Sequence, residues 1–446
     1  MNRMNDEPES TDPSRRQFLN RMAAGAAAAG VSFEATKAAF AQSVQPIAEA
    51  AQTWRVDEGY WERIRQQFLL EDGFAYLNNG TVGPTPGPVY NAMVEYWRMM
   101  AENPNEKSAI LQGRMELIRQ KVARFIGADS DEVAIVRNTT EGNSLVCQGI
   151  DLRPGDEVLI GYLEHESVRQ PWRLRARRHG VVIKEVAIGT PPKSPEEILN
   201  AFADAITPRT KLIHVAHSDT VIGAYTPVKE LAKLALSKGL LCFVDGAQVL
   251  GMFPVNVHDL GVDTYSATAH KWLDAPAGSA VLYVRRDLQD RIWPNIVTEN
   301  WYSYKDARKY ECLSRRPWPV VAALEDAIDF QLAIGPRRIE ERVRSLAGYL
   351  RAKAAQIPHI KMYSSNDPKL SGAITSLGLD NAPPARLIEY LRQKFDVYVA
   401  ARAKGDRYPA DPHGVEGIRI STHYYNTFEQ VDRVLQALQD LSSGKA

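Results

Sequence analysis

Two residues that could act on one ligand follow short apolar runs in the middle of the chain. Asp245 comes directly after Leu240–Val244, a run typical of a strand buried on both faces of a parallel sheet. Lys271 follows a second short strand, predicted over 264–267, and lies between His270 and Trp272. Because open α/β sheets bind ligands at the carboxyl ends of their strands, this spacing predicts an acid–lysine pair that converges on one ligand.

The chemistry of such a pair points to an aldehyde cofactor. A partly desolvated lysine can form a Schiff base, and pyridoxal phosphate (PLP) is the cofactor that uses one. Asp245 would keep the ring nitrogen protonated, and Gln248 can reach the ring's 3-oxygen if the turn brings it round. The alternative is a buried salt bridge and a surface lysine. That alternative is the weaker one, because the acid and the lysine lie in an extended motif. The motif is Asp-Gly-Ala-Gln-x-x-Gly-x-x-Pro followed by Ser-Ala-Thr-Ala-His-Lys-Trp.

The elements that must position this pair alternate between strand and helix. We expect seven strands, at 133–137, 157–161, 181–186, 211–216, 240–244, 264–267 and 279–284. Helices fit between them at 141–150, 165–178, 195–205 and 227–238, with others at 57–70, 86–102, 108–127 and 286–292. The alternation predicts a mainly parallel sheet covered by helices on both faces.

Beyond about residue 300 the pattern changes. An irregular aromatic stretch over 301–318 precedes predicted helices at 320–333 and 337–356. A smaller α+β region follows, with strands near 372–378, 396–399 and 417–421 and helices at 384–394 and 427–441. We therefore expect an N-terminal segment (42–85) that packs on the small domain and the active site, a large cofactor-binding domain (86–315) and a small C-terminal domain (316–446).

Composition excludes several classes of function. The 446 residues are 44% hydrophobic and 24% charged, as in globular proteins, and 54 basic residues balance 54 acidic ones. This neutrality gives no indication of a nucleic-acid partner. Three cysteines are too few and too scattered for a disulfide framework or a zinc site, and we expect no metal. No apolar run reaches the roughly 18 residues that a membrane span needs.

The first 41 residues contain the three parts of an export signal in the correct order. Ser14-Arg15-Arg16-Gln17-Phe18-Leu19 is a twin-arginine pattern, a small apolar run over 22–33 follows, and Ala39-Phe40-Ala41 is a small-x-small cleavage site. We expect recognition by the twin-arginine export machinery, cleavage near Ala41 and a periplasmic mature protein. An alanine-rich leader without a targeting role is the alternative, and the correct order of all three parts disfavours it.

The motifs around the acid–lysine pair resemble those of the class V aminotransferase family. The residues that carry the resemblance are Asp245-Gly246-Ala247-Gln248, Gly251, Pro254, Leu260-Gly261-Val262-Asp263 and His270-Lys271-Trp272. The family includes isopenicillin N epimerase and cysteine desulfurases, and the similarity extends over nearly the whole mature chain. It implies PLP fold type I (aspartate aminotransferase-like), a homodimer with the active site at the subunit interface, and Lys271 as the Schiff-base lysine.

Further roles follow from the resemblance. It implies that Thr139 and Thr140 bind the cofactor phosphate together with Thr268 and His270, and that His165 stacks on the pyridine ring. The phosphate role suits a strand-to-helix junction, and an N-cap by either threonine is compatible with it. Ser218 or Thr220 could contribute beneath the cofactor, or the segment could be an Asx turn at Asp219. Arg419 would bind a substrate carboxylate in a bidentate fork, and the predicted N-terminal substrate loop contains Asn78, Asn79 and Thr81.

Two departures from the family bear on the reaction. No cysteine follows Cys312, although cysteine desulfurases carry a loop cysteine in the small domain, and Ser314 could replace a hydroxyl that reaches the partner subunit's phosphate. The prediction is a PLP-dependent enzyme acting at the α-carbon of an amino-acid-like substrate, by transamination, epimerisation, elimination or decarboxylation. Export makes tailoring of a secreted metabolite such as a peptide siderophore plausible. The alternatives are a C–S lyase or desulfurase without the loop cysteine, and a non-catalytic binding protein with this fold.

Overall fold

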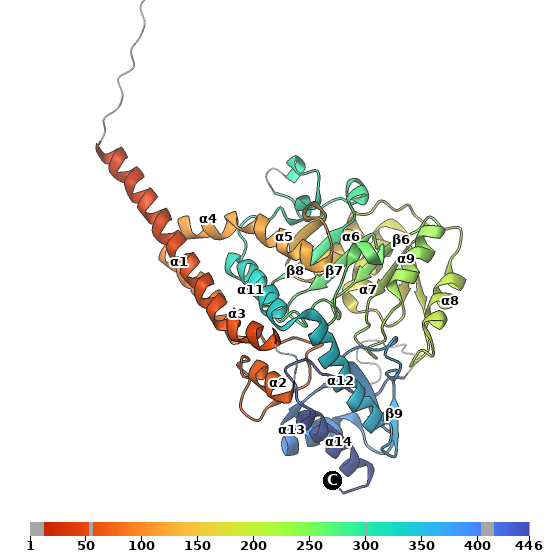
Figure 1. Cartoon of the computed structure of the whole chain (residues 1–446). Coiled ribbons are helices and arrows are strands. Elements are labelled where there is room, and N and C mark those ends of the chain that lie inside the picture. The colour runs from red at the N-terminus through yellow and green to blue at the C-terminus, as the bar shows by residue number, and fades with distance from the viewer. Residues whose placement is uncertain (1–12, 53–56, 299–300, 403–413, 446) are drawn as a thin grey trace, which may run out of the picture.

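The computed structural model describes residues 13–52, 57–298, 301–402 and 414–445, and over 13–31 it describes the backbone alone. A seven-stranded sheet in the order β2-β8-β7-β6-β5-β3-β4 forms the centre (Figure 1). Among its strands β8 runs antiparallel to both neighbours, and the other pairs are parallel. This confirms the predicted sheet, whose strands are β2 (Val133–Val136), β3 (Glu157–Gly161), β4 (Val182–Val186), β5 (Thr210–Ala216), β6 (Leu241–Asp245), β7 (Thr264–Thr268) and β8 (Ala280–Val284).

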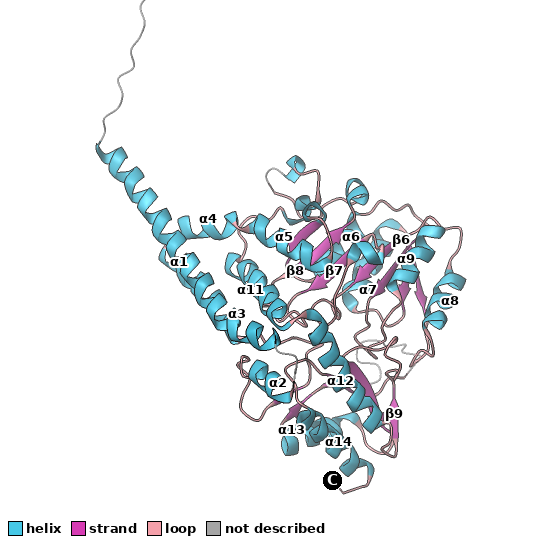
Figure 2. Ribbon diagram, viewed as in Figure 1, coloured by secondary structure: helices cyan, strands magenta, loops and turns pink. Residues whose placement is uncertain are grey.

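In most strands of this sheet, alternate residues face two different hydrophobic cores. In β2, Val133 and Ile135 belong to one core, and Ala134 and Val136 belong to the other. Successive side chains of a strand point to opposite faces, so helices must cover both faces, as Figure 2 shows. The first core is completed by α3 (Gly87–Glu102), α5 (Met115–Ile126), α8 (Pro195–Ala205), α9 (Val228–Ser237), α10 (Val257–Leu260) and α11 (Trp318–Ile334), and the second by α6 (Thr139–Gly149) and α7 (Glu166–His179).

The C-terminal region forms a second sheet in the order β12-β13-β10-β9, with its own hydrophobic core. Its elements are α12 (Pro336–Ala354), β9 (Ile360–Met362), β10 (Ile374–Leu379), α13 (Pro384–Phe395), β12 (Ala400–Arg402), β13 (Gly417–Ser421) and α14 (Phe428–Ser442). The N-terminal strand β1 (Ala75–Tyr76) pairs with β11 (Val397–Tyr398), and Asn78 bridges to Ser421. These pairings bring the loop after β1 beside Arg419, although the two are far apart in sequence.

Three predicted helices have different bounds in the structure. The helix expected over 57–70 is α2 (Glu58–Arg65), which is shorter. The helix expected over 108–127 is two helices, because α4 (Glu106–Gly113) ends at a glycine, a weak helix former, and α5 begins at Met115. The stretch 286–292 forms a 3₁₀ helix over Arg286–Arg291. These differences lie outside the strand ends that carry the predicted site.

Helix α1 (Pro13–Gln52) runs through the predicted cleavage position after Ala41. In Figure 1 it is the long red helix beside α3 and α11. Phe33 and Phe40 are buried in the large hydrophobic core, so this part of α1 packs on the body of the protein. No helix within the described residues is both long and apolar enough to pass through a bilayer. Cleavage and export stay predictions.

An ion pair fastens α1 to the body of the protein. Lys37 Nζ lies 2.6 Å from Asp326 Oδ1, whose side chain is completely buried, and 3.3 Å from Glu325 Oε2. Tyr96 also donates to Asp326, over 3.0 Å. A buried carboxylate that loses its cation is strongly destabilised, because neither water nor another charge replaces the partner.

We therefore expect Lys37→Met to lower the unfolding free energy of the full-length chain by about 3 kcal/mol in urea titrations. Lys229→Met is the matched control, because Lys229 forms an equally short but exposed pair with Asp259. The control should cost less than about 1 kcal/mol. Equal losses in the two variants would contradict the proposed importance of the buried pair.

Candidate active site

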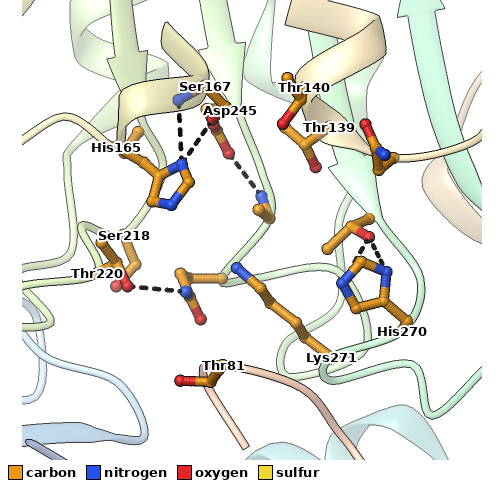
Figure 3. A pocket seen from close by; sticks show the side chains of 15 residues that line it. Thr81, Thr139, Thr140, His165, Ser167, Ser218, Thr220, Asp245, His270 and Lys271 are labelled. Atoms are coloured by element: carbon orange, nitrogen blue, oxygen red, sulfur yellow. Dashed lines mark hydrogen bonds between the residues drawn. The ribbon is translucent and has the colours of Figure 1, made fainter. Parts of the chain in front are cut away.

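One pocket collects the carboxyl ends of several strands. Strands β3, β5, β6 and β7 run parallel, and β2 points the same way as β7 because both are antiparallel to β8. The segments after these strands therefore meet at one edge of the sheet. The predicted site residues that line the pocket there are Thr81, Thr139, Thr140, His165, Ser218, Asp245, Gln248, Thr268, His270 and Lys271 (Figure 3).

Asp245 is held rigidly at the inner wall of the pocket. It is the last residue of β6 and is 4% exposed. Its Oδ2 accepts hydrogen bonds from Asn143 Nδ2 at 2.9 Å and Ser167 Oγ at 3.2 Å, and its Oδ1 accepts from Ala247 N at 2.9 Å. These three bonds fix the position of the carboxylate, which could accept a hydrogen bond from a protonated ring nitrogen.

His165 enters the pocket from the residue that caps α7. Its Nδ1 lies 3.1 Å from Ser167 N, which donates to it, and 3.0 Å from Ser167 Oγ. Ser167 thus contacts both His165 and Asp245 and fixes their relative position. The ring of His165 faces into the pocket beside Asp245 in Figure 3, where it could cover a planar ligand.

The other end of the pocket has the groups that an anion needs. Asn138, rather than either threonine, caps α6, and its side chain accepts from Glu141 N at 2.9 Å. The Thr139 hydroxyl is consequently not used as a cap; it is buried and has no hydrogen-bond partner within the described residues. An unpartnered donor at a helix N-terminus suits a phosphate. Thr140 also lines this end of the pocket.

Thr268, the last residue of β7, and His270, just after that strand, face this anion site. Thr268 Oγ1 lies 2.6 Å from His270 Nδ1. Burial, and secondarily the nearby charge of Lys271, lowers the pKa of His270 to about 4. The imidazole is therefore neutral at pH 7 before any anion binds, and it contributes as a hydrogen-bonding group.

Lys271 reaches into the pocket from a loop whose backbone is fixed by distant parts of the chain. The His270 carbonyl accepts from Gly83 N at 2.8 Å, and the Lys271 carbonyl accepts from Asn79 Nδ2 at 3.0 Å. A Cβ added at Gly83 would lie 2.0 Å from the Lys271 carbonyl oxygen, so this approach requires glycine. Tyr425 in turn donates to Asn79 Oδ1 at 3.0 Å.

The structure places two predicted ligand-binding residues behind the pocket wall. Asn79 is completely buried and contacts the lysine loop rather than the pocket, so it supports Lys271 here. Arg419 is 3% exposed, and its guanidinium donates to Asn78, Thr81 and Thr220. Buried backbone and side-chain oxygens need hydrogen-bond donors, and Asn79 and Arg419 both donate to such oxygens.

The loop after β5 satisfies both alternatives that the sequence left open. The Asp219 carboxylate accepts from the backbone N–H groups of Val221, Ile222 and Ala224, over 2.6–2.7 Å, which is the expected Asx turn. Ser218 and Thr220 on either side of Asp219 line the pocket. The turn therefore presents both hydroxyl residues to a ligand.

The cysteines and Ser314 lie away from the pocket. Cys147 and Cys242 are buried, and burial raises the pKa of both thiols. Cys312 is half-buried and, with Ser314, lines a separate hollow that also contains Glu116 and Arg119. No cysteine is therefore placed to act on a ligand in the pocket of its own chain. The predicted contact of Ser314 with a partner subunit stays a prediction.

Sequence reasoning missed Asn143 and Ser167. Asn143 follows Thr139 by four residues on α6, a spacing that puts both on one helix face, and this spacing could have revealed it. Ser167 lies two residues after His165, and only the fold shows that it reaches Asp245.

The residues present fit PLP. The orphaned Thr139 hydroxyl suits the phosphate, the Asp245 carboxylate suits a protonated ring nitrogen, and Lys271 is the amine that an aldehyde requires. Asp245 and His270 lie on different sides of the pocket in Figure 3.

Comparisons with known proteins bear on the fold and the cofactor. The family profile described as Aminotransferase class-V matches residues 75–434. Isopenicillin N epimerase of Amycolatopsis lactamdurans is 31% identical over 408 residues, which cover 86% of this chain and 98% of that protein. A probable cysteine desulfurase of Methanothermobacter thermautotrophicus is 30% identical over 405 residues, covering 85% and 98%. A solved C-DES variant with glycine linked to its PLP cofactor superposes with a TM-score of 0.76 at 23% identity, covering 84% of this chain and 99% of that one. These findings confirm the predicted fold type and cofactor.

Two buried histidines behind the pocket make the fold sensitive to acid. Burial lowers the pKa of His214 to about 4 and that of His217 to about 3. In the unfolded chain a histidine titrates near ~6.5. Between about pH 6.5 and pH 4 the unfolded state therefore binds more protons than the folded state, and the free energy of unfolding falls as the pH falls.

We expect His217→Phe to weaken this pH dependence. The unfolding free energy of this variant, measured in cofactor-free protein, should fall less steeply from pH 7 to pH 5. The reduction in slope corresponds to up to about one fewer proton taken up on unfolding. His179→Gln, which changes an exposed histidine at the end of α7, should keep the slope of the unmodified protein. A His217→Phe slope equal to that of the unmodified protein would show that His217 is not the group responsible.

Proposed function

The chain belongs to the aminotransferase class V family, and on that basis we propose that it acts at the α-carbon of an amino acid or amino-acid-like group. Lys271 in one pocket with Asp245 is the observation that carries this proposal. Bound PLP supplies an aldehyde for the substrate amine and a ring that withdraws electrons from its α-carbon. The chain's own residues must then bind, orient and move protons.

Each group in the pocket has a part in that chemistry. The Lys271 amine takes the proton from the substrate α-carbon and returns one as general acid. Asp245, fixed by Asn143 and Ser167, keeps a positive ring nitrogen in place. Thr139, Thr140, Thr268 and His270 hold the phosphate, and His165 covers the ring. Arg419 supplies positive charge for the substrate carboxylate.

The position of proton return decides among the possible outcomes. A proton returned to the opposite face of the α-carbon would give epimerisation, whereas transamination would need the proton to be delivered to the bound cofactor instead of the α-carbon. The similarity to isopenicillin N epimerase supports the first outcome. Persulfide-forming desulfurase chemistry is less well supported, because no cysteine lines the pocket, but a C–S lyase reaction needs no such cysteine. A non-catalytic binding protein would not need Lys271 in the pocket.

We further propose a homodimer and export. The family resemblance supports a dimer, and the hollow around Ser314 offers a surface for the second subunit. The twin-arginine pattern at Arg15 and Arg16 supports export of the folded protein to the periplasm. Tailoring of a secreted metabolite such as a peptide siderophore is a hypothesis that depends on export.

Lys271→Ala should remove the covalent attachment of the cofactor. The purified variant should lack the visible absorbance band of the attached cofactor, and borohydride should give no stable label. Lys238→Ala, at the exposed end of α9, is the control that should keep both signals. A label retained in Lys271→Ala would refute the assignment. With the unmodified enzyme, a screen of amino acids, small peptides and keto acids, read by product mass, then identifies the reaction.

Export is tested separately. The double substitution Arg15→Lys with Arg16→Lys should retain the protein in the cytoplasm, because the twin-arginine machinery reads the arginine pair as an address. Fractionation and immunodetection of cells measure this. A single change outside the twin-arginine pattern, Arg3→Lys, is the matched control and should not alter the distribution. An unchanged periplasmic yield of the double variant would count against export by this route.

A further inference from the structure

The side chains that α1 directs at the body of the protein form one continuous stripe. They recur at alternating intervals of four and three residues, which is the spacing of a helix that packs on one face along its whole length. We call them the docking stripe: Phe33, Lys37, Phe40, Val44, Ile47 and Ala51. The stripe continues through the predicted cleavage position after Ala41, with three members on each side of it.

The first members of the docking stripe cover side chains of α3 and α11, and Figure 1 shows α1 running along both helices. Phe33 stacks on Tyr96 of α3, with ring centroids 5.4 Å apart and ring planes 22° from parallel. The Arg114 guanidinium lies over the Phe33 ring, 4.8 Å from its centroid. Phe33, Phe40 and Tyr96 belong to the same core, and Tyr96 is completely buried. Without residues 33–41, this part of the core would face water.

Lys37 is the charged member of the docking stripe, and it faces two acids of α11. Its Nζ lies 2.6 Å from Asp326 Oδ1 and 3.3 Å from Glu325 Oε2. Glu325 also pairs with Arg114 and with Lys121, each at 3.2 Å. Within the described parts of the chain, Asp326 pairs with no basic side chain other than Lys37. Loss of the segment before the predicted cleavage position would therefore leave a buried carboxylate without its cation, which is strongly unfavourable.

The helix around the predicted cleavage position is weak by itself. Pro46 lies inside α1, and proline has no N–H to donate to the carbonyl four residues earlier, at Gln42. Helices in proteins are held mainly by the packing of one face, so this part of α1 depends on the docking stripe. Proteases cut segments that open from the folded body. The docked helix therefore protects the bond after Ala41, whereas an undocked segment would expose it.

We propose that α3 and α11 bind residues 33–51 of their own chain through Lys37 and the docking stripe, so that the bond after Ala41 stays uncut in the folded enzyme. The exported protein then keeps its leader, in contrast to the cleavage that the sequence alone predicts. This consequence rests on the proposed export, whereas the anchor itself does not. The family profile begins at residue 75, so the anchor lies outside the part of the chain that the family match covers.

Limited digestion of the PLP-loaded, full-length protein with chymotrypsin tests the anchor. This protease cuts after aromatic residues, and Phe40 is adjacent to the predicted cleavage position. Lys37→Glu places a third carboxylate beside Glu325 and Asp326 and should undock the segment. We expect the bond after Phe40 to be cut about tenfold faster in this variant than in the unmodified protein, because cutting follows the population of the open form. Mass spectrometry of the fragments measures both rates.

Two controls separate undocking of α1 from loss of the whole fold. Glu34→Lys reverses a charge on the exposed side of the same helix and should leave the cutting rate unchanged. The bond after Phe243, in the buried strand β6, should stay uncut in every variant. Phe33→Asp replaces Lys37→Glu if that variant does not fold. Equal cutting rates after Phe40 in the unmodified protein and in the undocking variant would overturn the proposal.

The N-terminus of the exported protein provides an independent test in cells. We expect the intact mass of the periplasmic protein to include residues 33–41. A periplasmic protein that begins at Gln42 would overturn the proposal. Absence of the protein from the periplasm would refute the proposed export alone, and the chymotrypsin comparison would still decide whether the segment is anchored.

Discussion

The backbone carbonyl groups around Lys271 are buried and must accept hydrogen bonds from the protein instead of water. The donors come from distant parts of the chain, so this requirement connects those parts to the lysine loop. Gly83 and Asn79 donate to the His270 and Lys271 carbonyls. The Trp272 carbonyl accepts from Gln331 Nε2 at 2.5 Å and lies 3.1 Å from His423 Nε2. The donors come from the loop after β1, from α11 and from the segment after β13. A lysine loop without these partners would carry unpaired buried carbonyls, which cost free energy.

The same contacts join the two domains across the pocket. Asp274, buried in the lysine loop, accepts from Tyr424 at 2.6 Å, and its Oδ2 lies 3.2 Å from His423 Nε2. Asn79 bridges the Lys271 carbonyl and Tyr425. The strand that carries Arg419 is therefore held in a fixed relation to Lys271. Under the proposed function, a substrate bound beside Arg419 would be oriented toward Lys271 for proton transfer at its α-carbon.

Charge is distributed in the pocket so that each end suits a different part of a ligand. Asp245 provides negative charge at the inner wall, and Arg419 provides positive charge behind Thr81 and Thr220. The phosphate end relies on neutral donors, including the orphaned Thr139 hydroxyl and His270. The relatives include an isopenicillin N epimerase and a probable cysteine desulfurase, so proteins similar to this chain differ in the reaction their names give. Cys147 and Cys242 are buried, and neither lines the pocket.

The sequence by itself determined the sheet, the cofactor and the residues at the strand ends. Apolar runs that end at Asp245 or precede Lys271 are local signals, and parallel strands bring their carboxyl ends together by geometry. The sequence could not determine which polar atoms are already occupied. Hydrogen bonds between residues far apart in the chain decide these partners. They decide whether Asn79 contacts a ligand or the lysine loop, and whether the Arg419 guanidinium is already occupied. They also decide whether Gln248 faces a ring oxygen or Thr220. Those partners are chosen by packing in three dimensions, because every buried donor and acceptor must be satisfied at once, and only the tertiary structure shows which hydroxyl is left to face the ligand.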